Sequence, residues 1–385
     1  PGKNNTLLKQ KRDGLLAKLY REGVMSEDSY HLALAEPLPE KKFDIPTVAP
    51  HLLAKAYRER KGKVCPTYID GRLQKKINEI VDGICKEGYT NICWLGIGGT
   101  WASSMQATVH MKEMSAIETW AENAAEYLTT GNKRIGKGTI VITSSVTGST
   151  IEVVQAVKKA QDAGAKVLGF IDIDTTELAK MVDYEIAYSA NEQLKFFMVA
   201  DRFMFNNGEF ADYERMYEEF EKYLAVALVE VEKKADDFGK EFAKKHWNDE
   251  LHYFVGAGNQ WGATYSYAMC YWEEQLWIKT KSITAPEFFH GMFEIVTRDT
   301  PVTIFVGEDA QRSLSERVVN FIPRICKNYT VIDTKDYELK GISPKFRSHI
   351  SHLVMHAVNN RIDAHMEEET CHPMEIRRYY RKLNY

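Results

Sequence analysis

A glycine-rich turn occurs twice in this chain, 160 positions apart, and constrains the fold more than any other feature. The first copy is residues 95–102 (LGIGGTWA) and the second is residues 255–262 (VGAGNQWG). Each copy follows a short apolar run and precedes a helical pattern. The next apolar runs, 139–143 and 302–306, keep nearly the same offset. A strand–turn–helix unit repeated at this distance predicts two related α/β domains.

Apolar runs alternate with helical patterns after the first turn. The runs at 91–95, 116–120, 139–144 and 166–173 have strand length, and residues 154–161 have helical periodicity. Strands that are apolar on both faces and separated by helices are typical of a parallel sheet covered by helices. The sequence therefore predicts an α/β fold with a parallel sheet in each half.

The flanking segments complete the expected domain organisation. A charged region precedes the first domain, with helical patterns at 52–58 and 73–81 and with prolines between positions 37 and 50. We expect this region to pack on the main body. A long amphipathic charged pattern at 210–246 is expected to be one helix joining the halves. The expected parts are a helical N-terminal extension (1–75), a first domain (76–208), a linking helix (209–248), a second domain (249–370) and a C-terminal tail (371–385).

Composition excludes several classes of function. The net charge is −4, which does not suggest binding to nucleic acid. The six cysteines form no C-x-x-C pair, so a zinc cluster is not expected and the thiols fit a reducing compartment. The sequence contains no stretch of eighteen apolar residues, so a membrane span is not predicted. The first residues lack the apolar core of a signal peptide. We expect a cytoplasmic protein that does not bind a membrane.

Residues 145–150 (SVTGST) follow a predicted strand and are a candidate phosphate site. Ser149 with Glu152 three positions later has the spacing of a capping box at a helix start. Free N–H groups there, together with the hydroxyls of Ser145, Thr147 and Thr150, would cradle a phosphate. Gly148 lets the backbone approach a ligand. A capped helix without any ligand remains the alternative.

The first glycine-rich turn is a poor dinucleotide site. The dinucleotide fingerprint requires a third glycine for close packing of helix on strand, and Trp101 occupies that position. Binding of NAD is therefore disfavoured. Thr100 and Trp101 could instead line a sugar site.

Glu274 and His290 are candidate acid–base residues. Glu274 lies in a helical pattern beside Tyr271, Trp272, Leu276 and Trp277, whose side chains would desolvate a carboxylate and raise its pKa. His290 lies in an apolar turn and could transfer protons near neutral pH. A solvated glutamate and a structural histidine remain the alternatives from spacing alone.

Three histidines and the C-terminal tail could be functional, but each also has a purely structural interpretation. His349, His352 and His356 share one face of a predicted helix, but no H-E-x-x-H pattern completes them, so packing is favoured over metal binding. The tail could fold over an anionic site or remain solvated. Its basic and aromatic residues are Arg377, Arg378, Tyr379, Tyr380, Arg381 and Lys382.

Together these residues resemble the sugar isomerase (SIS) domain family in its tandem arrangement, over about residues 75–385. The family's phosphate loop, S-x-S-G-x-T, falls on residues 145–150, with Thr147 in place of a serine. Its small-residue turn falls on Gly99-Thr100. A family glutamate stands sixteen positions before the histidine of E-x-x-H-G-P-x-E, as Glu274 stands before His290; Met292 replaces the proline. The tail from Pro373 resembles that of the fructosamine 6-phosphate deglycases.

The resemblance implies flavodoxin-like SIS domains and a deglycase that converts a fructosamine 6-phosphate and water to glucose 6-phosphate and an amine. Glu274 would move the proton, and His290, from the neighbouring subunit of a homodimer, would help open the sugar ring. No metal or other cofactor is implied. An aldose–ketose or amino-sugar phosphate isomerase and a non-catalytic sugar-phosphate sensor remain alternatives, and the amine stays open. Phosphate would bind Ser145, Thr147, Gly148, Thr150 and Thr100, and further contacts could come from Trp101, Asn191, Gln193, Glu287 and Arg378.

Overall fold

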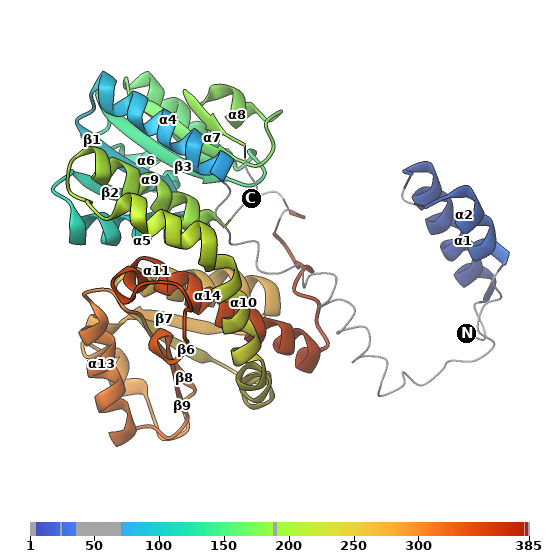
Figure 1. Ribbon diagram of the computed structural model, residues 1–385. Coiled ribbons are helices and arrows are strands. Elements are labelled where there is room, and N and C mark those ends of the chain that lie inside the picture. The colour runs from blue at the N-terminus through green and yellow to red at the C-terminus, as the bar shows by residue number, and fades with distance from the viewer. Residues whose placement is uncertain (1–4, 24, 36–70, 188–190, 381, 384–385) are drawn as a thin grey trace. The chain divides into compact units, whose positions relative to one another are not determined.

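The computed structural model in Figure 1 contains two units, Pro1–Arg60 and Lys61–Tyr385, each described here by itself. In the smaller unit, α1 (Asn5–Arg21) and α2 (Glu27–Ala35) pair through their tyrosine rings, 4.9 Å apart. The helix expected at 52–58 and the prolines before it lie outside the described residues. The structure describes residues 5–23, 25–35, 71–187, 191–380 and 382–383.

The first described element of the larger unit is α4 (Gly71–Glu87), which confirms the helical pattern at 73–81. Its apolar residues recur every three to four positions, and one face is buried against the first domain's core. The buried side chains are Leu73, Ile77, Val81 and Ile84. This helix belongs to the larger unit although the sequence assigned its first residues to the N-terminal extension.

The first domain contains a five-stranded parallel sheet in the order β2-β1-β3-β4-β5. The central strands are buried on both faces, as their continuous apolar sequences predict. The second strand begins three residues later than the expected run at 116–120. The strands are β1 (Asn91–Gly96), β2 (Thr119–Asn123), β3 (Thr139–Ser145), β4 (Lys166–Ile171) and β5 (Tyr184–Ile186).

Helices follow the strands of this domain, as the alternating pattern predicts. The loop after β3 differs from the expected capping box, because the helix that it leads into has Thr150 as its N-cap, without a side-chain cap bond. Gly148 has a positive φ of 58° and turns the chain, so Ser149 lies outside the helix and its hydroxyl donates to Thr147. The helices are α5 (Gly99–Met114), α6 (Ala124–Thr130), α7 (Ile151–Asp162), α8 (Glu177–Met181) and α9 (Glu192–Asn206).

A 34-residue helix, α10 (Tyr213–His246), connects the two domains and confirms the amphipathic pattern at 210–246. It packs along α14 (Arg347–Thr370), the last helix of the second domain. At Gly239 the helices are so close that a Cβ would lie 2.9 Å from the backbone of Arg361. The Arg361 side chain also donates to Asp236 on α10, at 2.9 Å.

The second domain has a four-stranded parallel sheet in the order β7-β6-β8-β9, which repeats the order of the first four strands of domain one. Its strands are β6 (His252–Gly256), β7 (Thr280–Thr284), β8 (Val302–Val306) and β9 (Tyr329–Asp333). Its other elements before α14 are α11 (Asn259–Ser266), a π-helix η1 (Tyr267–Leu276), α12 (Ala285–Phe288), η2 (Met292–Ile295), α13 (Arg312–Phe321), η3 (Ile322–Arg324), η4 (Thr334–Asp336) and η5 (Pro344–Phe346).

The two glycine-rich turns have the same backbone conformation, which confirms the repeat. Gly98 has φ 61° and ψ −128°, Gly258 has φ 62° and ψ −137°, and each is the N-cap of the following helix. The two helices, α5 and α11, pack against each other between the sheets (Figure 1). They meet at Gly262, where a Cβ would lie 2.4 Å from the carbonyl oxygen of Ala102. The two halves are therefore joined through equivalent elements.

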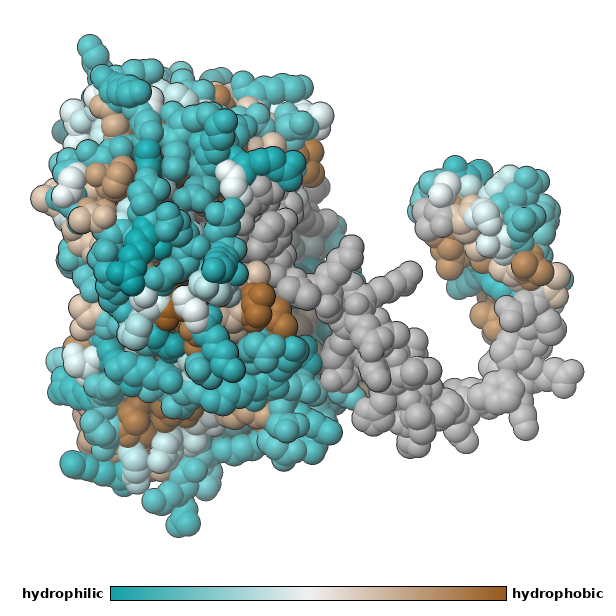
Figure 2. All heavy atoms as spheres, in the orientation of Figure 1, coloured by the Kyte–Doolittle hydropathy of each residue, from teal (hydrophilic) through white to brown (hydrophobic). Residues whose placement is uncertain are grey.

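The outer surface of the larger unit differs in character from its three buried apolar clusters. On the face shown in Figure 2 hydrophilic residues predominate, and apolar residues occur in small separate groups. Among the described residues, no helix has the length and apolar composition needed to cross a membrane.

Candidate functional site

A cavity of about 340 Å³ lies where the two domains meet, and we call it the inter-domain cavity. It opens beside the ends of β1 and β3, the edge of a parallel sheet at which ligands usually bind. The first domain contributes Gly99, Ser103, Val146, Asn191, Glu192 and Gln193. The second contributes Ala263, Ser266, Tyr267, Cys270, Tyr271, Glu274, Gln275, His352, His356 and Asn359.

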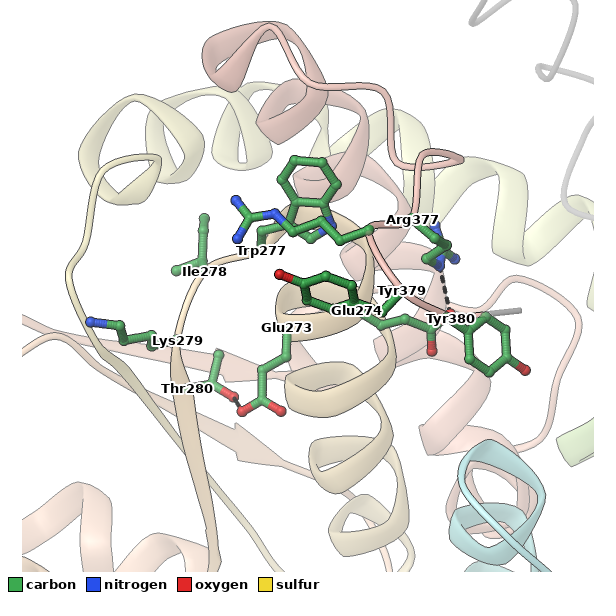
Figure 3. A pocket seen from close by; sticks show the side chains of 10 residues that line it. Glu273, Glu274, Trp277, Ile278, Lys279, Thr280, Arg377, Tyr379 and Tyr380 are labelled. Carbon is green, nitrogen blue, oxygen red and sulfur yellow. Dashed lines mark hydrogen bonds and ion pairs between the residues drawn. The ribbon is translucent and has the colours of Figure 1, made fainter. Parts of the chain in front are cut away.

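Glu274 lies on the π-helix η1 and lines this cavity. A π-helix of ten residues is rare, and π-helical turns occur frequently at functional sites. One carboxylate oxygen, Oε1, accepts a hydrogen bond of 2.7 Å from Nε of Arg377 in the C-terminal tail (Figure 3). The side chain of Glu274 keeps 30% exposure, so it remains reachable from the cavity.

The apolar environment expected around Glu274 is only partly present. Trp272 and Leu276 are buried in the main core, and the carboxylate retains solvent and an arginine partner. Tyr271 lines the inter-domain cavity, where burial raises the pKa of its hydroxyl. Burial also raises the pKa of the Cys270 thiol to about 11. Both groups are therefore neutral near neutral pH.

A second cavity, of about 500 Å³, lies between the end of η1 and the C-terminal tail, and we call it the tail cavity (Figure 3). Glu274 thus lines both cavities. Trp277 anchors the tail, because the ring of His372 lies 4.0 Å from it and the guanidinium of Arg378 lies 4.1 Å above it. The full lining is Glu273, Glu274, Trp277, Ile278, Lys279, Thr280, Arg377, Arg378, Tyr379 and Tyr380.

The loop at 145–150 joins β3 to the uncapped start of α7, and its Val146 lines the inter-domain cavity. Ser145 is buried, and its hydroxyl accepts from the backbone N–H of Gly148 at 3.0 Å. A Cβ on Gly148 would lie 2.1 Å from the Thr176 hydroxyl, so the loop requires glycine there. Val146 is therefore the residue of this loop that shares a cavity with Glu274, whereas Ser145, Thr147, Gly148 and Thr150 are not part of the lining.

Thr100, predicted to bind phosphate, has its hydroxyl directed to other protein groups. It donates to a carboxylate oxygen of Glu192 at 3.0 Å and to the carbonyl of Ser144 at 3.3 Å. Ser103 donates to the other oxygen of Glu192 at 2.8 Å. Glu192 was not predicted as a site residue; the signal for it was its place in the first turn of a helix, between the candidates Asn191 and Gln193.

The two flagged neighbours of Glu192 both line the inter-domain cavity. Asn191 is the N-cap of α9, and its side-chain oxygen accepts from the N–H of Leu194 at 3.1 Å. The side-chain oxygen of Gln193 is buried and has no hydrogen-bond partner among the described residues. Trp101, in contrast, packs edge-on against Tyr265 and lines neither cavity.

His290 lies in the turn after α12 and is exposed, as is Glu287. The backbone N–H of His290 donates to the carbonyl of Glu287 at 3.0 Å. Neither residue lines a cavity that contains Glu274, so the fold of one chain does not bring His290 to the glutamate.

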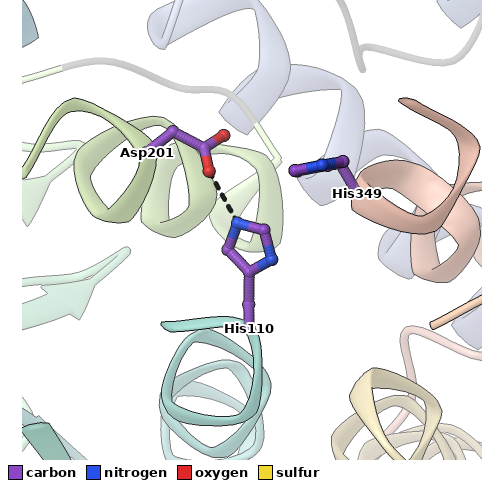
Figure 4. Close-up of side chains that lie close together, drawn as sticks. All are labelled: His110, Asp201 and His349. Carbon is purple, nitrogen blue, oxygen red and sulfur yellow. Dashed lines mark hydrogen bonds and ion pairs between the residues drawn. The ribbon is translucent and has the colours of Figure 1, made fainter. Parts of the chain in front are cut away.

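Two histidines of α14 are buried against α5 and α9: the ring of His349 contacts His110, and that of His352 contacts Phe197. His356 is half-buried, and its nearest ring is that of Tyr271 on η1. His110 lies 2.6 Å from Asp201, and His349 lies beside this pair (Figure 4). Burial lowers the pKa of His349 to about 4, with His110 adding to the shift. The burial of His349 agrees with the predicted packing role. The side-chain atoms of His110, Asp201 and His349 that could bind a metal ion nevertheless lie within 4.8 Å of one another. His352 and His356 also reach the inter-domain cavity.

Asp363 was not flagged by the sequence, yet it lies directly behind the inter-domain cavity. Burial raises the pKa of its carboxyl to about 8. Tyr267, which lines the cavity, donates its hydroxyl to Asp363 at 2.8 Å. Nothing in the local sequence distinguishes this aspartate from a solvated helix residue.

Known proteins with a similar sequence include SIS-domain proteins and deglycases. The model of the SIS domain family matches residues 88–201. Fructosamine deglycase FrlB of Bacillus subtilis (strain 168) is 27% identical over 326 residues, covering 82% of this chain and 98% of its own length. Fructoselysine 6-phosphate deglycase of Escherichia coli (strain K12) is 22% identical over 273 residues, covering 70% of this chain and 80% of its own.

Solved structures share the fold over both domains. A crystal structure from Bacillus subtilis, whose name proposes a phosphosugar isomerase, has a TM-score of 0.75 and 25% identity, covering 82% of this chain and 100% of that one. The C-terminal domain of glucosamine-fructose-6-phosphate aminotransferase from Francisella tularensis has a TM-score of 0.64 at 12% identity, covering 78% of this chain and 92% of that one.

Proposed function

We propose that this chain, a SIS-domain protein related to fructosamine deglycases, hydrolyses a fructosamine 6-phosphate to glucose 6-phosphate and a free amine. The observation that carries the proposal is the position of Glu274, which lines two cavities, one of which is also lined by Val146 of the predicted phosphate loop. Similarity over nearly the whole length of a fructosamine deglycase supports the same reaction class.

The loop at 145–150 would bind the 6-phosphate. The first N–H groups of α7 follow Thr150, which makes no side-chain cap bond, so they can donate to an anion. Thr147 and Thr150 would add hydroxyl donors. Binding of the distant phosphate would orient C1 and C2 of the open-chain sugar over Glu274 and lower the barrier by restricting motion.

Glu274 would then act as general base. It removes a proton from C1, which bears the amine, while the C2 ketone oxygen gains a proton, giving an enaminol. The proton is returned to C2 as the nitrogen loses its own, which gives an imine at C1. Water adds to C1 and the C1–N bond breaks, releasing the amine and the aldose 6-phosphate. A positioned base contributes roughly 10²–10⁴-fold to the rate.

His290 would transfer a proton at the ring oxygen, so that the cyclic sugar opens before the base acts. Because this residue is exposed and lines neither cavity of its own chain, we propose that a second copy supplies it, and that the active protein is a homodimer with shared sites. The exposed turn carrying Glu287 and His290 would enter the neighbour's site.

Release of glucose 6-phosphate from fructosamine 6-phosphates, followed with a coupled dehydrogenase, tests the proposal. Wild type should turn over, and Glu274→Gln should lose activity by about 10²-fold or more. Glu250→Gln, an exposed change in the bend before β6, is the matched control and should retain full activity. Turnover that persists in Glu274→Gln would refute the role of this residue. Interconversion without release of amine would instead favour an isomerase, which would need the same glutamate.

A further inference from the structure

We propose that the tail cavity binds the amine portion of the substrate and selects amines that carry a carboxylate next to the glycated nitrogen. This inference rests on the proposed deglycase reaction and names its substrate class. Arg377 would be the selecting residue, because it exchanges Glu274 for the substrate carboxylate.

The position of Glu274 divides the substrate between the two cavities. Glu274 lines both cavities, so the carbon that it deprotonates would lie where the two cavities meet. Val146 of the predicted phosphate loop lines the inter-domain cavity, which would place the sugar there. The nitrogen on C1 and its substituent then extend into the tail cavity, whose volume of about 500 Å³ accommodates an amino acid.

The charges of the tail cavity fit an anionic substituent. Lys279, Arg377 and Arg378 supply three positive charges against two carboxylates. Both carboxylates already have partners, since Glu273 accepts from the Thr280 hydroxyl at 2.6 Å and Glu274 accepts from Arg377. Stacking over Trp277 fixes the plane of the Arg378 guanidinium and leaves its N–H edges available to a ligand.

The distance between Arg377 and Glu274 specifies where the substrate carboxylate belongs. In an amino acid glycated on its α-nitrogen, the carboxylate carbon is two bonds from that nitrogen, so it lies within a few ångströms of C1. Nε of Arg377 lies 2.7 Å from the base that acts on C1, and is therefore within reach of this carboxylate. An amino acid linked through a long side chain would carry its α-carboxylate well beyond Arg377.

Binding of such a substrate would release the base. The Arg377 guanidinium binds Glu274 through Nε, while its Nη1 donates to the carbonyl of Met374. Nε and Nη2 therefore form the edge that can hold a carboxylate of the ligand by two parallel N–H donors. When Arg377 turns to the ligand, Oε1 of Glu274 becomes available to accept the C1 proton. An amine without a carboxylate leaves Arg377 on Glu274 and is processed slowly.

The test compares the 6-phosphofructosyl derivatives of glycine and of methylamine, which differ only by the carboxylate. In wild type kcat/KM should favour the glycine compound by about 10–100-fold, the size of one charge-assisted pair. Arg377→Gln should abolish this preference, chiefly by lowering kcat/KM for the glycine compound, and Arg377→Lys should restore part of it. Arg378→Gln should reduce the preference. Lys281→Gln, an exposed charge on β7 outside the cavity, should leave it unchanged.

Equal kcat/KM for the two compounds in wild type would overturn the inference while leaving the deglycase reaction in place. If neither compound is turned over, the deglycase reaction itself fails, and isothermal titration with the same compounds decides the subsite. Tighter binding of the glycine compound that is lost in Arg377→Gln would support the subsite, and equal affinities would overturn it.

Discussion

Ser103 on α5 donates a hydrogen bond of 2.8 Å to the carboxylate of Glu192 at the start of α9. Thr100, one helical turn earlier, donates to the other oxygen. The carboxylate is thus held by two hydroxyls and lines the same cavity as Glu274. A negative side chain fixed in this way at a ligand cavity can orient a sugar hydroxyl.

Replacing Glu192 by alanine should lower kcat/KM by about 10–100-fold, because it removes a cavity wall and leaves two hydroxyls without their acceptor. Glu192→Gln should have a smaller effect, since its amide oxygen can still accept one of the two bonds. Steady-state kinetics with a fructosamine 6-phosphate measures both. Glu177→Gln, an exposed change in the first turn of α8, is the control. Wild-type kinetics in Glu192→Ala would exclude this role.

Ser145→Ala should weaken phosphate binding, because the Ser145 hydroxyl holds the N–H of Gly148 and shapes the loop. Glucose 6-phosphate should raise the Tm of wild type in proportion to the logarithm of its concentration. The same concentrations should raise the Tm of Ser145→Ala much less. Glucose without phosphate should have little effect on either. Thr175→Ala changes an exposed hydroxyl outside this loop and should respond as wild type does. An equal shift in Ser145→Ala would remove this loop from the phosphate site.

Gly262→Ala should destabilise the protein by about 1–3 kcal/mol, because a Cβ would press on the carbonyl oxygen of Ala102 where α5 and α11 meet. Gly83→Ala provides the opposite case. This helical glycine has no atom within 4 Å of its would-be Cβ, so alanine should add about 0.5–1 kcal/mol. Urea unfolding of both variants measures the difference. Equal free energies of unfolding for the two variants would mean that α5 and α11 can move apart to accommodate the Cβ without loss of stability.

His349 should make the protein less stable as the pH falls. Burial lowers its folded-state pKa to about 4, against 6.5 in the unfolded chain. Between these values the unfolded chain binds the proton and the folded one does not, so the free energy of unfolding declines as pH falls from about 6.5 towards 4. Urea unfolding at several pH values should show a shallower decline in His349→Gln. An identical decline in both proteins would contradict the assignment.

Most of the fold could be predicted from local patterns. The repeated glycine turn predicted two equivalent strand–helix units. Gly98 and Gly258 both have a positive φ, a conformation that favours glycine, so the conformation of the turn is visible in the sequence. The parallel sheets followed from strands apolar on both faces. The prediction of a capping box was wrong, because Thr150 and not Ser149 is the N-cap of α7. The spacing of Ser149 and Glu152 does not reveal that Gly148 turns the chain before the helix starts.

The site was less predictable, because its contacts join distant positions. Glu274 and the phosphate loop had motif spacing, and the structure places both at one cavity; their roles stay predictions. The pairing of Arg377 with Glu274 spans 103 residues, and that of Ser103 with Glu192 spans 89. Such contacts depend on how domains and tail pack, and neither neighbouring residues nor periodicity encodes them.

The π-helix has a consequence for how relatives of this protein should be compared. A helix with i to i+5 bonds turns less per residue than an α-helix, so the direction of Glu274 depends on the number of residues between Tyr267 and position 274. A homologue that had lost one residue from this stretch could still align its glutamate with this one, while aiming it elsewhere. The glutamate and the length of the segment must therefore be inherited together, and a gap in this helix is a better warning of altered chemistry than a substitution beside it.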